Sequence, residues 1–127
     1  MAVALAALVT AGCGGGGGAK APPVSLSGTV NNHGTKTASG SMEVELDDFY
    51  FGPTFIKATA GQKITIELHN EGSTAHTLTS TELGNVDEEL APDAKKTITV
   101  TAPASGSALF FCRFHRGTGM QGAVFIA

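Results

Sequence analysis

Apolar and polar side chains alternate along the chain from residue 42 onward. In the stretch MEVELD, residues 42–47, apolar positions alternate with acidic ones, and in KITIEL, residues 63–68, they alternate with polar ones. Successive side chains of a β-strand point to opposite faces, so a period of two predicts strands with one buried face. No stretch of this region sustains the 3.6-residue period of an amphipathic helix. The pattern therefore favours an all-β fold.

Turn signals divide this region into short pieces. Gly52-Pro53 and Gly61-Gln62 adjoin apolar runs and predict turns. Further strands are expected at residues 76–79, 96–101, 107–112 and 122–126. About seven short strands within residues 42–127 predict an antiparallel Greek-key β-sandwich. Residues 81–94 are the one stretch in which we expect a helical turn.

The N-terminal part of the chain has a different composition. Residues 2–11 are apolar or small, a run well short of the ~20 residues that a membrane-spanning helix needs. We therefore expect a cleaved export signal over residues 1–13. The small residues before Cys13 resemble the lipobox of bacterial lipoproteins, in which the cysteine carries the lipid. Residues 14–41, rich in Gly, Ser, Thr and Pro, predict a flexible tether, and residues 42–127 form the folded domain.

Charge and cysteine content narrow the function. From residue 42 onward there are six basic and eleven acidic side chains, a balance that argues against nucleic acid as a partner. With Cys13 lipidated, Cys112 is the one remaining thiol of an exported protein, where thiols normally pair. Metal ligation is one reason for an unpaired thiol to be present.

The stretch CRFHRGTGM holds a thiol, an imidazole and a thioether, at Cys112, His115 and Met120. Calcium and magnesium prefer oxygen ligands, so this set excludes them. A thiolate with an imidazole suits zinc or copper, and the soft thioether favours copper. A copper site of this kind needs two histidines and one cysteine in a plane, with the methionine as a long axial contact.

The second histidine must come from another part of the chain. His33 lies in the predicted tether, where we expect a solvated side chain. His69 falls on the polar side of the strand that begins with KITIEL, so we expect it on the surface. His76 follows the loop NEGSTA and opens the next strand, which makes it the preferred candidate.

These residues carry a resemblance to a known family. ITIELHNEGSTAHTLTS, followed much later by ALFFCRFHRGTGM, resembles the cupredoxins, which are small blue-copper proteins. The likeness extends over residues 42–127. It implies that one copper ion is bound by four ligands and cycles between Cu(I) and Cu(II), so that the protein carries single electrons. The implied ligands are His76, Cys112, His115 and Met120.

The resemblance also implies contacts around the site. The backbone N–H of Thr77 is expected to donate to the Cys112 sulfur. Plastocyanins usually have proline where this chain has Phe114, so we expect a second hydrogen bond to the sulfur from the Phe114 N–H. The edge of the His115 ring is expected at the surface as the entry point for the electron.

Charged residues flank the predicted site. Arg113 and Arg116 lie on either side of His115, and we expect a positive rim that either is simply solvated or steers an acidic partner. The acidic residues are expected elsewhere on the surface, as a second docking face or, preferably, as a solvated edge; they are Glu82, Asp87, Glu88, Glu89 and Asp93.

Other functions remain open at this point. Cys112 and His115 as a nucleophile and its base would need an aligned third group, and we expect a protein that is not an enzyme. A module that delivers or buffers copper would use the same four ligands. A structural zinc site is a further alternative, although zinc seldom recruits methionine.

Together these patterns predict an exported, monomeric electron carrier. A lipid on Cys13 would anchor it to a membrane on the periplasmic or extracellular side, and the tether would keep it near its partners. The expected partners are redox proteins that are themselves exported or membrane-bound.

Overall fold

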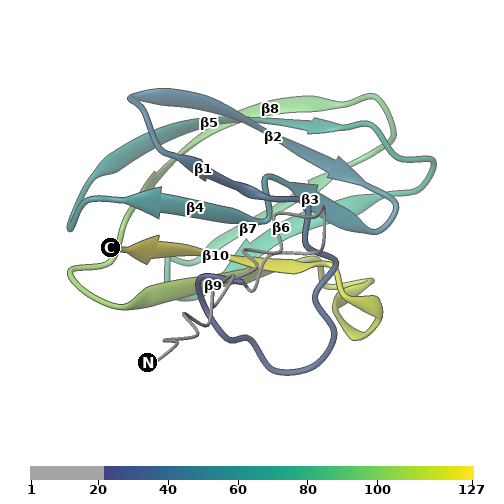
Figure 1. Ribbon diagram of the computed structural model, residues 1–127. Helices are drawn as coiled ribbons and strands as arrows, with labels where there is room; N and C mark the ends of the chain where they lie inside the picture. The colour runs from purple at the N-terminus through teal and green to yellow at the C-terminus, as the bar shows by residue number, and fades with distance from the viewer. Residues whose placement is uncertain (1–21) are drawn as a thin grey trace, which may run out of the picture.

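The computed structural model of the chain describes residues 22–127, which form two β-sheets packed against each other (Figure 1). The six-stranded sheet contains, in spatial order, β1 (Thr35–Thr37), β4 (Phe55–Ala58), β10 (Gln121–Ile126), β9 (Ser107–Phe111), β6 (His76–Ser80) and β7 (Val86–Leu90). The four-stranded sheet contains β3 (Tyr50–Gly52), β2 (Ser41–Asp47), β5 (Lys63–Asn70) and β8 (Lys95–Thr101). A 3-10 turn, η1 (Arg116–Thr118), precedes β10. Nothing among the described residues forms a helix with the length and hydropathy that a membrane span requires.

The core lies between the two sheets, where the alternating apolar residues meet. In β5, every second side chain from Ile64 onward is buried, and β2 buries Val44 and Leu46 in the same manner. Phe51 of β3 meets Phe110 of β9 edge to face, with ring centroids 5.0 Å apart. Such a pair adds about 0.5–1.5 kcal/mol to the free energy gained from burial alone. The rings therefore help to join the two layers.

The expected all-β sandwich is confirmed, but the strands are more numerous and differently paired. The described residues contain ten strands, not seven. The segment 81–94, in which we expected a helical turn, contains β7 instead. The sheets are mixed, because β2 runs parallel to β5 and β4 runs parallel to β1 and β10. Alternation in a sequence identifies a strand and its buried face, but it carries no signal for the direction of the neighbouring strand.

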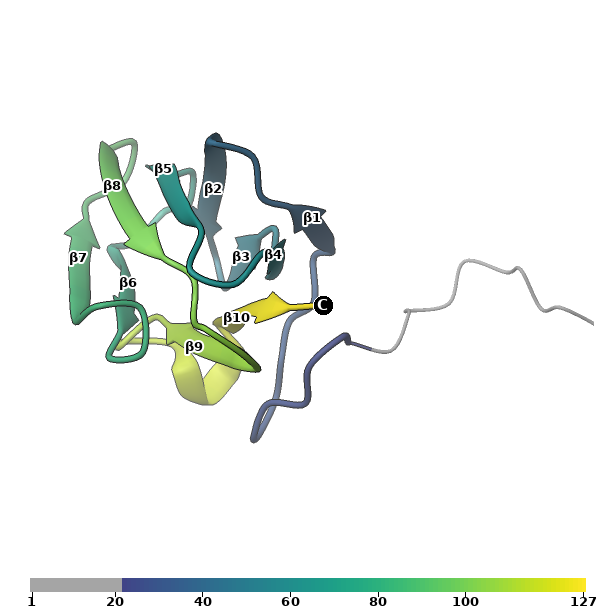
Figure 2. The ribbon, with the colours of Figure 1, turned by 90° about the vertical axis from the view of Figure 1, so that its left-hand side faces the viewer.

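Residues 27–41 were predicted to be part of a flexible tether, but in the structure they are bound to the folded domain. The side-chain amide of Gln121 donates to the backbone carbonyls of Ser27 and Thr29, at 2.7 and 2.8 Å. Strand β1 then pairs with β4 at the edge of the larger sheet. Figures 1 and 2 show this segment running along one side of the sandwich. Hydrogen bonds to its backbone hold this segment on the sandwich. Its composition, with few apolar side chains, gave no sign of this attachment.

Three N-terminal predictions fall on residues that the structure does not describe. These are the export signal over residues 1–13, the lipid on Cys13 and the first part of the tether, up to residue 21.

A polar cluster occupies the outer face of β2 and its neighbours. The Tyr50 hydroxyl lies 3.2 Å from the Asp47 carboxylate and 3.4 Å from that of Glu45. Partial burial, together with hydrogen bonding to and repulsion by Glu71 and Asp47, raises the pKa of Glu45 from 4.5 to about 7. Burial and the same carboxylates raise the pKa of Tyr50 to about 12. The cluster is therefore most stable when Glu45 holds a proton.

We expect Glu45→Gln to change the pH dependence of stability. Because the folded state raises the pKa of Glu45, it binds the proton more tightly than the unfolded state does. Stability from this group is therefore greatest below pH 4.5 and falls as the pH rises to about 7. The neutral amide removes this loss, so at pH 8 the variant should be more stable by on the order of 1 kcal/mol, after allowance for solvent screening.

Urea unfolding at pH 4.5 and pH 8 measures the effect, with Glu43→Gln on the exposed part of the same strand as the control. An equal stability change at both pH values would show that the Glu45 pKa is not raised.

Candidate metal centre

Three of the sequence-predicted ligands meet at one end of the larger sheet. His76 is the first residue of β6, Cys112 directly follows β9, and His115 lies in the loop before η1. Strands β6 and β9 are neighbours, with Thr79 paired to Phe111. This pairing brings the start of one strand to the end of the other. The loop that holds His115 and η1 is the yellow turn at the right of Figure 1.

The donor atoms of these residues are close enough to bind one ion. The Nδ1 atoms of His76 and His115 are 3.2 Å apart. The Cys112 Sγ lies 3.9 Å from Nδ1 of His76 and 3.5 Å from Nδ1 of His115. A nitrogen and a sulfur that bind the same ion lie at most about 4.4 Å apart, which is the sum of one metal–nitrogen and one metal–sulfur bond length. All three separations fall below this limit. His76 and Cys112 are completely buried, so the group lies in a site that excludes water from two of its three donors.

Met120 lies at the base of the same loop. Its carbonyl accepts a hydrogen bond from the Cys112 N–H at 3.0 Å, and its N–H donates to the His115 carbonyl at 3.2 Å. Its side chain is fully buried. Gly119, just before it, has φ of +106°, a left-handed conformation that glycine adopts without strain. The loop is therefore closed by its own backbone, with the predicted ligands at both of its ends.

The Cys112 sulfur accepts one of the two expected hydrogen bonds. The Thr77 N–H lies 3.4 Å from Sγ, and this prediction is confirmed. Within residues 22–127, no hydrogen bond joins the Phe114 N–H to the sulfur, so that expectation is wrong. In the turn after Cys112, the N–H groups of His115 and Arg116 both donate to the Cys112 carbonyl, at 3.3 and 3.0 Å.

The outer nitrogen of His76 has a partner that sequence reasoning missed. Its Nε2 lies 2.7 Å from Oδ1 of Asp48. The other oxygen of that carboxylate accepts hydrogen bonds from the Ser73 N–H at 2.9 Å and the Ser73 hydroxyl at 2.6 Å. The bonds from Ser73, more than the contact with His76, lower the pKa of Asp48 to about 2. In the sequence, Asp48 directly follows a predicted strand that already contains three acidic residues, and nothing sets it apart.

The accessible side of the site has an apolar rim. His115 is half-buried, and burial, followed by the proximity of His76, lowers its pKa below the ordinary value. The Phe49 ring packs against the His115 ring with centroids 4.6 Å apart. Phe49 and Phe114 are 40% and 49% exposed, so two aromatic side chains lie beside the partly exposed imidazole.

The charged surroundings differ from those expected. Arg113 pairs with Asp87 at 2.9 Å and approaches Glu89 at 3.8 Å. The acidic strand β7 therefore lies next to the site, not elsewhere, and it offsets the charge of Arg113. The guanidinium of Arg116 lies over the Phe111 ring, 4.5 Å from its centroid. The predicted positive rim is thus reduced mainly to Arg116.

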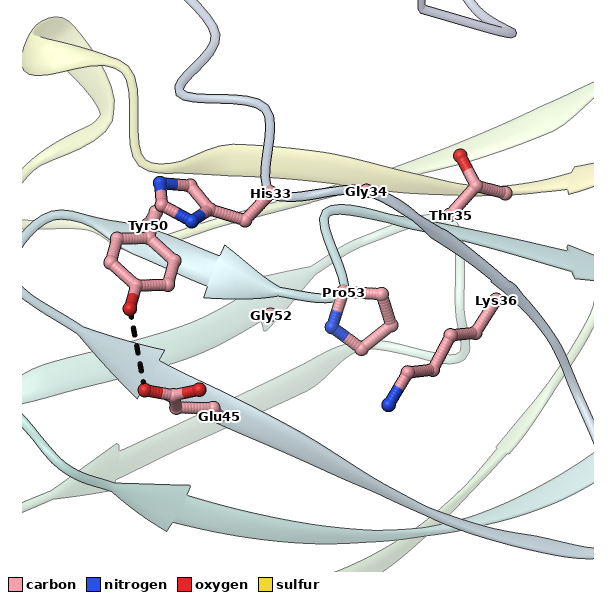
Figure 3. Close-up of a pocket in the computed structure, with 8 residues that line it drawn as sticks. All are labelled: His33, Gly34, Thr35, Lys36, Glu45, Tyr50, Gly52 and Pro53. Carbon is pink, nitrogen blue, oxygen red and sulfur yellow. Dashed lines mark hydrogen bonds between the residues drawn. The ribbon is translucent and has the colours of Figure 1, made fainter. Parts of the chain in front are cut away.

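The other two histidines have different surroundings. His69 is 3.1 Å from Glu71 and 4.0 Å from Glu43. His33 is exposed, but its ring stacks on Tyr50 with centroids 3.4 Å apart, beside a hollow of about 270 Å³ (Figure 3). The expectation of a solvent-exposed His33 is therefore confirmed, but its stacking on Tyr50 was not expected. Neither histidine belongs to the group that contains Cys112.

Asn31 ties the N-terminal segment to the ligand loop. Its side-chain amide donates to the Phe49 carbonyl at 2.8 Å and to the Thr118 carbonyl at 3.0 Å, and its backbone N–H donates to the Gly119 carbonyl at 2.9 Å. A Cβ atom on Gly119 would lie 2.8 Å from the Asn31 side chain. The close approach thus depends on glycine, and Asn31 joins two loops that border the site.

Comparison with known proteins agrees with this architecture. Residues 23–126 match the family of cupredoxin-like domains, and the chain belongs to that family. The domain therefore begins well before residue 42, in agreement with the position of β1. No curated protein matches the sequence.

Several solved structures share the fold. The dithionite-reduced auracyanin of Roseiflexus castenholzii superposes with a TM-score of 0.60 at 22% identity, covering 71% of this chain and 98% of its own. Auracyanin A of Chloroflexus aurantiacus, a "blue" copper protein, gives 0.54 at 22% identity, with 74% and 100% covered. A multicopper oxidase gives 0.58 at 18% identity, with 68% of this chain and 41% of its own covered. At these identities the likeness shows the fold.

We expect Asn31→Ala to loosen the ligand loop. The substitution removes two side-chain hydrogen bonds, and we expect a loss of about 1–2 kcal/mol in the free energy of unfolding. Hydrogen exchange should become faster at the amides of residues 116–119. The matched control is Asn32→Ala, which removes a local bond to the Gly34 N–H and touches neither loop. Equal exchange at residues 116–119 in both variants would contradict the role of Asn31.

Proposed function

We propose that the protein is a single-electron carrier with one copper ion bound by His76, Cys112, His115 and Met120. The observation that carries the proposal is the convergence of two histidine nitrogens and one thiol sulfur within 3.9 Å of one another. The buried Met120 at the base of the same loop adds a soft fourth donor. Bound copper would accept and release one electron by cycling between Cu(I) and Cu(II).

The chain's own contribution is a rigid donor set. His76 is held by β6, and the ends of the ligand loop are joined by the bonds between Cys112 and Met120. Donors that are fixed by a sheet and a closed loop move little when the charge of the site changes. The barrier to electron transfer therefore stays low, since little reorganisation is needed. The Thr77 N–H stabilises negative charge on the sulfur.

The electron would enter and leave at the edge of His115. Phe49 and Phe114 lie beside this ring and are substantially exposed. An apolar surface of this kind favours short-lived docking, because it excludes water without requiring a fixed set of ion pairs. Arg116 adds a positive charge at the rim, which favours acidic partners.

The location and partners proposed for this carrier rest on the N-terminal sequence. An export signal ending at Cys13, with a lipid on that residue, would place the domain outside the cytoplasm and at a membrane. The proposed partners are exported or membrane-bound redox proteins, and the carrier would act as a monomer and not as an enzyme. The multicopper oxidase that shares the fold is much longer than this chain, which covers 41% of it.

The burial of the donors favours an electron carrier over copper delivery. A delivery protein must release its ion to another protein, for which exposed ligands are suited. Here His76 and Cys112 are both inaccessible to solvent. Zinc would fit the two imidazoles and the thiol, but it would leave the buried thioether without a role.

Cys112→Ser tests the proposal. Loaded with Cu(II), the protein should show an intense visible band from thiolate-to-copper charge transfer and a narrow copper hyperfine splitting by EPR. Both should be lost in the variant, because serine has no thiolate. His69→Ala, which removes a histidine outside the site, should leave both signals unchanged. A colourless protein, or a copper signal that survives without the thiol, would favour copper exchange or zinc.

A further inference from the structure

The function proposed above assigns no role to the carboxylate of Asp48. It lies 2.7 Å from Nε2 of His76, on the side of the ring away from the Cys112 sulfur. An ionised carboxylate only accepts hydrogen bonds, so Nε2 carries the ring proton. In the neutral imidazole, Nδ1, which faces the sulfur and His115, is then the unprotonated nitrogen. The contact therefore selects the tautomer that a metal ligand needs.

The surrounding chain is shaped to hold this contact. Both donors of Ser73 bind the far oxygen of the carboxylate. Gly72 leaves room for the pair, because a Cβ atom there would lie 2.4 Å from Oδ1 of Asp48 and 2.7 Å from Nε2 of His76. Gly72 is itself positioned by its N–H, which donates to the buried side chain of Asn70 at 2.9 Å.

We propose that Asp48 is a positioning residue that fixes His76 as an Nδ1 ligand and lowers the reduction potential of the copper centre. The proposal rests on the function proposed above. A carboxylate that accepts the Nε2 proton raises the electron density of the imidazole and thus its basicity as a ligand. Its negative charge also favours the more positive ion. Both effects stabilise Cu(II) relative to Cu(I), which lowers the potential.

Asp48→Asn separates the charge from the hydrogen bond. The amide has nearly the same shape, and its one oxygen can accept from Nε2. Its nitrogen then faces Ser73, whose hydroxyl can turn to accept while the exposed Ser73 N–H turns to water, so the fold is expected to persist. Loss of the charge should weaken Cu(II) binding relative to Cu(I) by about tenfold, the lower end of the effect of such outer contacts. For a one-electron couple this corresponds to a rise of about 59 mV in the reduction potential. A redox titration followed through the visible band measures it.

Two further variants separate Asp48 from general effects. Glu43→Gln removes the same charge from an exposed side chain that contacts His69 instead of the site, and it should leave the potential unchanged. Gly72→Ala keeps the carboxylate but places a methyl group where the pair meets, so the potential should rise as in Asp48→Asn. Circular dichroism of each variant checks that the sheets are intact.

A second readout requires no copper. Nitrogen-15 NMR of the metal-free protein should show His76 with its proton on Nε2, and Asp48→Ala should yield a mixture of both tautomers. An unchanged tautomer in Asp48→Ala would overturn the positioning role. An unchanged or lower potential in Asp48→Asn with the visible band retained, or an equal rise in Glu43→Gln, would overturn the effect on potential while leaving the electron carrier in place. Absence of the band in the unmodified protein would instead remove the proposed function.

Discussion

The pairing of β6 with β9 is the interaction on which the site depends. With Thr79 opposite Phe111, the start of β6 lies beside the residues that follow β9. The Thr77 N–H then reaches the Cys112 sulfur, and the Thr77 hydroxyl accepts the Arg113 N–H at 2.9 Å. A shift of one residue would turn the inward side chains of one strand outward. Burial of Leu78 and Phe110 in the common core opposes such a shift, so core packing also sets the position of the donors.

The sequence allowed part of this arrangement to be predicted, for identifiable physical reasons. The alternation in β2 and β5 reflects one buried and one exposed face, and it led to the sandwich. The predicted ligands were recognisable because a thiol, two imidazoles and a thioether are chemically unusual in combination, and the structure brings the donor atoms of His76, Cys112 and His115 together. The Thr77 bond followed from the family resemblance.

The features that were missed depend on contacts between distant polar residues. Asp48 meets His76 across 28 positions, and Asn31 meets Thr118 across 87. In each case the residue type is common, and the residue has a role only because a turn places it beside a distant partner. Strand β1 was missed because its three exposed residues pair through the backbone. Strand β7 was missed because its acidic residues resemble a solvated loop, although charges on an edge strand also oppose pairing between molecules.

The long separations around the centre bear on the order of folding. Asp48, His76 and Cys112 lie in three different segments, and Asn31 adds a fourth from near the start of the described chain. Contacts between such distant positions form late, because closing long loops costs entropy before any contact is gained. Until then the thiol of Cys112 is accessible to oxidants, whereas in the folded protein it is fully buried. The assembly of the two sheets therefore also protects the Cys112 thiol chemically, because it closes the core around the sulfur.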